Sequence, residues 1–169
     1  MKGSSLCAYT GAALFVVLIV LFSMLGASQP STALLIAMGA IGAAAHLVLL
    51  PVVAAMPAPE WARAAGYGWL VIDTMLNVAA VNGLDPNLAG ALRLGGHASS
   101  ALWMATAAQH SRGAVRAIGW PLAAVLMFHA FAARWVPAWV IFPPFVTIPI
   151  WLVCIGRSLP RTSDQARSA

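Results

Sequence analysis

Long apolar stretches that alternate with short polar loops organise the whole chain. Six stretches reach the length of about 17–25 mostly apolar residues that a membrane-spanning helix needs. They cover about residues 8–27, 32–56, 66–83, 87–109, 114–134 and 137–156. The loops between them run to about ten residues or fewer, so consecutive helices are expected to be antiparallel neighbours. The pattern predicts an all-α bundle of about six transmembrane helices, forming one domain over residues 1–169.

Composition strengthens this prediction. Of the 169 residues, 62% are hydrophobic and 8% are charged, and the mean hydropathy is +0.88. Soluble domains carry about 25% charged residues, so a water-soluble fold is excluded. The apolar content excludes intrinsic disorder, and two cysteines are too few for a disulfide scaffold. The sequence therefore predicts an integral membrane protein that contacts membrane lipids and has almost no mass outside the bilayer.

The distribution of positive charge predicts the orientation. One set of loops and both termini carry seven basic residues, namely Lys2, Arg63, Arg112, Arg116, Arg157, Arg161 and Arg167. The opposite loops carry only Asp85 and Arg134. Because basic loops stay in the cytoplasm, both termini are expected there, as in a bacterial inner-membrane protein. Residues 157–169 are expected to form a short basic tail at anionic lipid headgroups. The net charge of +5 follows from this asymmetry and gives no reason to expect nucleic acid as a partner.

The first stretch also has features of a cleaved signal peptide. Lys2 precedes an apolar run, and the small residues Gly26, Ala27 and Ser28 follow it. Pro30 lies close to any cut at these residues, which favours an uncleaved helix.

Ionisable residues inside the spans give the candidate site, because such residues are costly in lipid and usually face a bundle interior. Asp73 and Asn77 lie four residues apart on one face of the third span, and Arg93 and His97 repeat this spacing on the fourth. Measured from the turn around Asp85, Asp73 and His97 both lie ~18 Å deep. Asn77 and Arg93 both lie ~12 Å deep. We predict a buried Asp73–Arg93–His97 cluster, with Asn77 as a hydrogen-bonding partner. The structural alternative is a pair that neutralises itself and locks two helices together.

Two further histidines lie inside spans. His46 lies near the middle of the second span, and His129 lies well inside the fifth. A bis-histidine haem is one interpretation of such residues. By depth, His46 and His129 fall in different leaflets, although His46 and His97 are closer in level. No span carries a second histidine at ligand spacing, so no metal or cofactor is expected, and both histidines are retained as candidate ligand-binding residues.

The last span is rich in proline and aromatic residues. Pro143 and Pro144 each remove a backbone donor, so the helix is expected to be broken there and to border a pocket. The rings expected to line this pocket are those of Trp139, Phe142, Phe145 and Trp151. Four other tryptophans, Trp61, Trp69, Trp120 and Trp135, lie near the predicted span ends and fit an interfacial aromatic belt.

Small residues recur at helix-packing spacing in two spans. The second span reads GAIGAAAH over residues 39–46. The fourth span carries the small residues Gly95, Gly96, Ser99 and Ser100. Such residues let helix backbones approach closely within one chain, or alternatively form the interface of a homo-oligomer.

Three functions remain open from the sequence. In the first, the chain binds or transports a small ligand at the polar cluster, with proton coupling through a histidine beside a carboxylate. In the second, it is an enzyme for a lipid-like or isoprenoid substrate, with Asp73 as general acid or base and His97 as a second catalytic residue. In the third, it is a structural subunit whose cluster fixes helix registry. No nucleotide-binding or hydrolase motif is present. The first function is favoured because a small six-span protein without a soluble domain more readily binds or moves a ligand than performs multistep chemistry.

Overall fold

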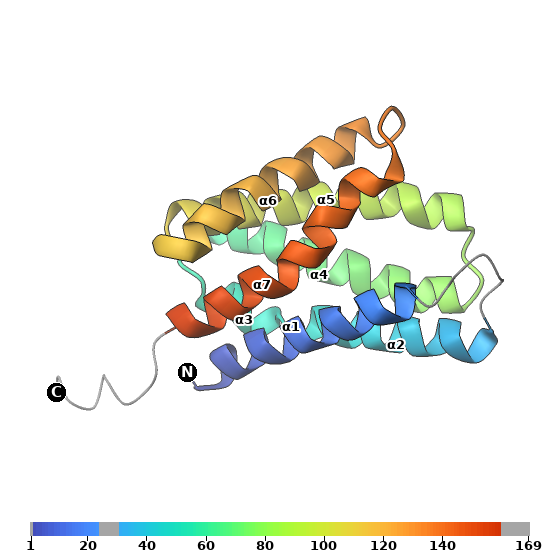
Figure 1. The fold of residues 1–169 in the computed structure, drawn as a ribbon, viewed down its shortest axis with the longest axis horizontal. Coiled ribbons are helices and arrows are strands. Elements are labelled where there is room, and N and C mark those ends of the chain that lie inside the picture. Colours follow the sequence, from blue (N-terminus) through green and yellow to red (C-terminus); the bar gives the residue numbers. More distant parts are fainter. Residues whose placement is uncertain (1, 24–30, 160–169) are drawn as a thin grey trace, which may run out of the picture.

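The computed structural model describes residues 2–23 and 31–159, and within these ranges it contains helices and no strands (Figure 1). The helices, in chain order, are α1 (Lys2–Ser23), α2 (Thr32–Leu47), α3 (Leu50–Ala55), α4 (Glu60–Val81), α5 (Pro86–Gln109), α6 (Gly113–Ala132), the 3-10 helix η1 (Ala138–Ile141) and α7 (Phe142–Ser158). The predicted all-α fold is therefore confirmed.

Five helical segments are long and apolar enough to cross a membrane. They cover residues 3–23, 32–55, 60–81, 113–132 and 139–158. The sixth, α5, has 24 residues but is less apolar, because its middle carries Arg93, His97 and two serines. It packs alongside α4 and α6 over its length and so runs through the bundle beside them (Figure 1). The chain is an integral membrane protein by these criteria.

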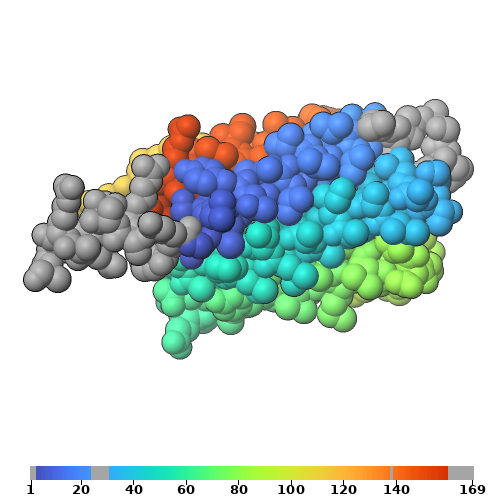
Figure 2. All heavy atoms as spheres, turned by 90° about the horizontal axis from the view of Figure 1, so that it is seen from below, coloured from blue at the N-terminus to red at the C-terminus, as the bar shows by residue number. Residues whose placement is uncertain are grey.

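The outer surface of the bundle is apolar, as a lipid-facing surface must be. Large hydrophobic side chains point outward from every long helix, among them Val17, Ile36, Met75, Leu92, Phe128 and Ile150. Figure 2 shows the face on which α1 and α2, blue and cyan, lie side by side. In water this surface would favour aggregation, whereas in a bilayer it matches the solvent.

The helices form a closed ring in chain order. Each of α1, α2, α4, α5, α6 and α7 packs against the next, and α1 closes the ring against α7. The contact between α1 and α7 is tight, because Ser5 Oγ donates to the Gly156 carbonyl at 2.6 Å and the Tyr9 ring covers Gly156. The start of α1 and the end of α7 therefore lie at one end of the bundle, which we call the terminal end (Figure 1).

Three tryptophans fill the ring toward its terminal end. Trp69, Trp103 and Trp151 come from α4, α5 and α7, and each is at most 3% exposed. Their ring centroids are 5.8 Å apart from Trp69 to Trp103 and 5.5 Å apart from Trp103 to Trp151. Gly66 and Gly119 make room for them, because a Cβ at either position would lie 2.8 Å from an indole ring. We call these three rings the tryptophan column.

The second predicted span, residues 32–56, is not one continuous helix. It divides into α2 and α3, with a turn at Val48 and Leu49. Pro51 explains the break, because proline has no amide proton to donate to the carbonyl four residues earlier and its ring clashes with that carbonyl. The break comes directly after His46, which therefore lies in the last turn of α2.

The turn between the third and fourth spans lies where the sequence predicts it. Helix α4 ends at Val81, and Gly83 takes the left-handed conformation with φ of 88°. The Asp85 carboxylate then caps α5, accepting hydrogen bonds at 3.0 Å from the amides of Asn87 and Leu88. Helices α4 and α5 are consequently antiparallel neighbours, as the short connection requires.

The expected break at Pro143 and Pro144 is not confirmed. Helix α7 runs continuously from Phe142 to Ser158, and both prolines lie in its first turn. Amides there have no partner within a helix, so the missing donors cost little. The irregular part of this span is η1, which precedes α7.

Two other expectations fall largely outside the described residues. Of the predicted basic tail, residues 157–169, the structure describes Arg157 at the end of α7 and two residues after it. The small residues of the alternative cleavage site, Gly26 to Ser28, lie outside the described ranges altogether.

Candidate functional site

Asp73 lies at the centre of the polar cluster, in the middle of α4, with 5% of its surface exposed. Its Oδ2 atom accepts a hydrogen bond from the Trp69 indole at 2.6 Å and lies 3.3 Å from His46 Nε2. Its Oδ1 atom lies 3.8 Å from Arg93 Nε, which is an ion pair longer than a hydrogen bond. Three helices, α2, α4 and α5, thus converge on one carboxyl group.

The contacts of His46 determine where its protons are. His46 Nδ1 lies 2.7 Å from the Gly42 carbonyl oxygen, which can only accept, so Nδ1 carries a proton. His46 Nε2 faces Asp73 Oδ2, and a hydrogen bond there needs one more proton between them. That proton belongs either to an imidazolium beside a carboxylate or to a carboxylic acid beside a neutral imidazole. In both arrangements the His46–Asp73 pair has no net charge.

Arg93 and Asn77 lie together, as the depth arithmetic predicts. Arg93 Nη2 donates to Asn77 Oδ1 at 3.4 Å, and the Arg93 side chain is 37% exposed. Helix α2 comes close to α4 at this level, because a Cβ at Gly42 would lie 2.8 Å from the Asn77 amide group. The glycines of α2 therefore serve close packing within the chain, which agrees with the intrachain interpretation of this segment.

His97 lies beside the same cavity but not in direct contact with Asp73. Within the described ranges, no hydrogen bond or ion pair joins these two residues. The His97 ring instead approaches His129 of α6, with centroids 5.5 Å apart. His97 Nδ1 and His129 Nδ1 are both buried without a hydrogen-bonding partner. The predicted cluster of Asp73, Arg93 and His97 is therefore better described as Asp73, His46 and Arg93, with His97 nearby.

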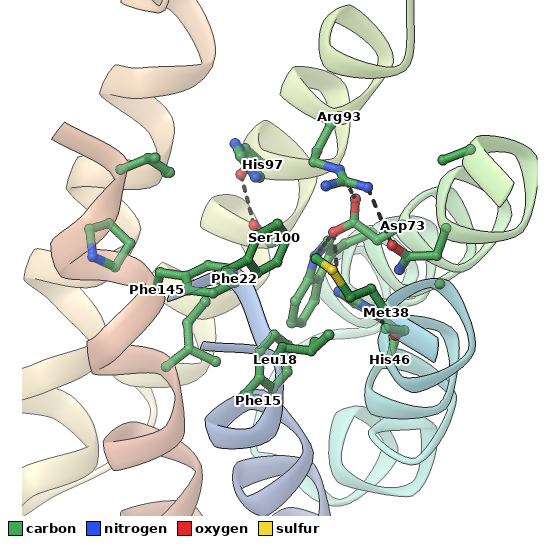
Figure 3. A pocket seen from close by; sticks show the side chains of 18 of the residues that line it. Phe15, Leu18, Phe22, Met38, His46, Asp73, Arg93, His97, Ser100 and Phe145 are labelled. Atoms are coloured by element: carbon green, nitrogen blue, oxygen red, sulfur yellow. Dashed lines mark hydrogen bonds and ion pairs between the residues drawn. The ribbon is translucent and has the colours of Figure 1, made fainter. Parts of the chain in front are cut away.

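A cavity of about 220 Å³ lies next to these groups. Residues from all six long helices line it, and it extends from the level of His46, Trp69 and Asp73 toward the end of the bundle opposite the terminal end. Figure 3 shows Arg93, Asp73 and His97 at one side and Phe22 and Phe145 at the other. The cavity therefore has a polar base and apolar walls, as ligand pockets commonly have.

The aromatic residues of the last span take different places. Phe145 lines the cavity and packs edge-on against Phe22, with centroids 5.4 Å apart. Trp139 and Phe142 are 70% and 60% exposed and do not line it, because η1 and the first turn of α7 present them outward. Trp151 belongs to the tryptophan column and donates to the Val115 carbonyl at 2.8 Å. Of the four rings predicted to line a pocket, the structure places Phe145 in the cavity lining and the other three outside it.

Trp69 and His46 are the partners of Asp73 that the sequence prediction missed. Trp69 is not part of an interfacial belt, whereas Trp61, Trp120 and Trp135 are exposed as the belt predicts. Its position four residues before Asp73 was the available signal, because residues four apart share a helix face. His46 lies on α2, and no pattern within α2 indicates which helix its ring faces.

In the part of the chain that the structure describes, no three residues among histidine, cysteine, aspartate and glutamate come together to hold a metal ion. Comparison of the chain with family models, with curated proteins and with solved structures finds no match.

Substitution of Trp69 tests this arrangement. Trp69→Phe removes the donor to Asp73, and we expect the free energy of unfolding to fall by about 1–3 kcal/mol, the cost of an unsatisfied buried polar group. Trp61→Phe, at a 59% exposed position on the same helix, should leave it unchanged. Thermal unfolding in detergent, followed by circular dichroism, measures both. Equal effects of the two substitutions would contradict the assigned hydrogen bond.

Proposed function

We propose that this protein binds a small ligand in the intramembrane cavity and transports it. The observation that carries the proposal is a cavity lined by all six long helices with an ionisable base formed by buried His46 and Asp73 and half-buried Arg93. Ionisable groups at this depth are expensive, and they commonly mark ion or substrate paths. A cluster needed only for helix registry would have no reason to border a cavity.

The cavity is asymmetric, which indicates how the ligand reaches it. Toward the terminal end the ring is closed by the tryptophan column, whose members are at most 3% exposed. The cavity lining continues instead to Phe22, Leu35 and Val81, near the opposite end. We therefore propose entry from the side opposite the termini, with a rearrangement of the tryptophan column needed for release on the other side.

The proton shared by His46 and Asp73 is the proposed coupling proton. It lies at the base of the cavity, where an arriving ligand can change which residue holds it. Asp73→Asn keeps the shape of the side chain but cannot exchange this proton. Any pH dependence of ligand retention in the unmodified protein should therefore disappear in Asp73→Asn.

Native mass spectrometry of protein extracted gently from its own membrane tests ligand binding. Leu18 is 5% exposed and lines the cavity, whereas its neighbour Val17 is 42% exposed on the outer face. Leu18→Trp fills the cavity, so a retained small mass present in the unmodified protein should be lost. Val17→Trp is the matched control and should keep it. A mass retained equally by both variants would show that the cavity is not the binding site.

We also propose the orientation with both termini in the cytoplasm, in a bacterial inner membrane. Arg63, Arg112, Arg116 and Arg157 all lie on segments at the terminal end, and Asp85 and Arg134 lie at the opposite end. Basic residues concentrate on the cytoplasmic side. A green fluorescent protein fused to the C-terminus should fluoresce, and alkaline phosphatase fused there should be inactive. Active phosphatase would reverse the orientation.

A further inference from the structure

Basic side chains outnumber acidic ones in the cavity lining. Among the described residues that line it, Arg93, His46 and His97 accompany one acidic residue, Asp73. Asp73 Oδ2 already accepts from Trp69 and faces His46, and a proton held between His46 and Asp73 makes that pair neutral. Arg93 stays protonated, and its Nε lies 3.8 Å from Asp73 Oδ1, farther than a hydrogen bond. A loosely paired positive charge in a low-dielectric layer favours a ligand of opposite sign.

The geometry around Arg93 leaves hydrogen-bond donors for such a ligand. The guanidinium has five N–H groups, and within the described ranges its contacts are one hydrogen bond to Asn77 at 3.4 Å and the 3.8 Å ion pair to Asp73. His97 lies one helical turn further along α5 and lines the same cavity. An oxyanion placed against Arg93 would therefore meet a charged fork of donors, with an imidazole beside it.

The rest of the lining is apolar and limits the size of the ligand. Leu18 and Phe22 of α1 and Phe145 and Ile148 of α7 line the apolar side of the cavity, where the Phe22 and Phe145 rings pack edge-on against each other. The volume of about 220 Å³ is below the range of about 300–1,000 Å³ for drug-sized ligands. The space suits one short apolar chain rather than a two-chain lipid.

We infer that the cavity takes a single-chain amphiphile whose head is a carboxylate or a phosphate bound by Arg93. The apolar tail lies in the cavity along the wall that α1 and α7 form together, against the Phe22 and Phe145 rings. This inference rests on the proposed ligand-binding function and adds to it the chemical class of the ligand. A carboxylate head corresponds to a fatty acid and a phosphate head to a single-chain lipid phosphate, so the test includes both.

The test uses the purified full-length chain in a non-ionic detergent and four probes with the same eight-carbon tail. Octanoate and octyl phosphate carry the anionic heads, 1-octanol is neutral, and octyltrimethylammonium is cationic. Each probe is titrated while the unfolding temperature is recorded, because a ligand that binds the folded state raises it. The variants are Arg93→Gln, Leu18→Trp and, as a matched control, Arg134→Gln, whose arginine is exposed and outside the cavity.

We expect octanoate or octyl phosphate to bind at least about tenfold more tightly than 1-octanol, the margin of one charge-assisted contact. The two anions compared with each other identify the head group. This difference in affinity should vanish in Arg93→Gln and persist in Arg134→Gln. Leu18→Trp should bind none of the probes. Arg93→Lys keeps the charge and should retain part of the preference.

Equal binding of octanoate and 1-octanol, or tighter binding of the cation, would overturn the inferred class of ligand. If the probes that bind the unmodified chain no longer bind Leu18→Trp, the ligand-binding function stands and only the anionic class fails. If no probe shifts the unfolding temperature of the unmodified chain, both fail. The comparison among probes on the unmodified chain holds even where a variant does not fold.

Discussion

A carboxyl group in the middle of a membrane-spanning bundle is costly unless polar side chains surround it. At Asp73 this requirement brings three helices to one point. The Trp69 indole comes from the preceding turn of α4, the His46 imidazole from the end of α2, and the Arg93 guanidinium from α5. The glycines of α2 allow the approach to α4, and the break after His46 lies directly beside the contact. The packing of α2, α4 and α5 is thus organised around a single side chain.

The ring of six helices divides into two halves with different roles. Toward the terminal end the tryptophan column fills the interior, with glycines opposite Trp103 and Trp151 giving the rings space. Toward the opposite end the same ring encloses the cavity. Asp73 lies at the boundary between the two halves. A ligand that reaches the base of the cavity therefore meets both the His46–Asp73 pair and Trp69, the member of the tryptophan column that lines the cavity.

Much of this arrangement could be predicted from the sequence, because helix spans are set by local apolar content and short loops fix which helices are adjacent. The closeness of Arg93 to Asp73 and Asn77 follows from counting residues on either side of the turn at Asp85. Trp69 was misplaced because the predicted span began at residue 66, whereas α4 begins at Glu60 and places Trp69 nine residues inside. The contact of His46 with Asp73 was missed although its two spans are consecutive, because no pattern within α2 indicates which helix the His46 ring faces. The effect of Pro143 and Pro144 depends on where α7 begins, which the sequence pattern does not fix. Because α7 begins at Phe142, both prolines lie in its first turn and do not break it.

The central claim is that the Asp73 cluster serves a ligand and not only the packing of helices. The most direct measurement compares ligand retention, by native mass spectrometry, and thermal unfolding in the unmodified chain and in the double variant Asp73→Leu/Arg93→Met. Replacement of a buried ion pair by apolar side chains of similar volume is often neutral for stability. We therefore predict a folded double variant with near-normal unfolding that has lost the retained ligand. A double variant that is folded and keeps the same ligand would show that the cluster is structural, and would contradict this account.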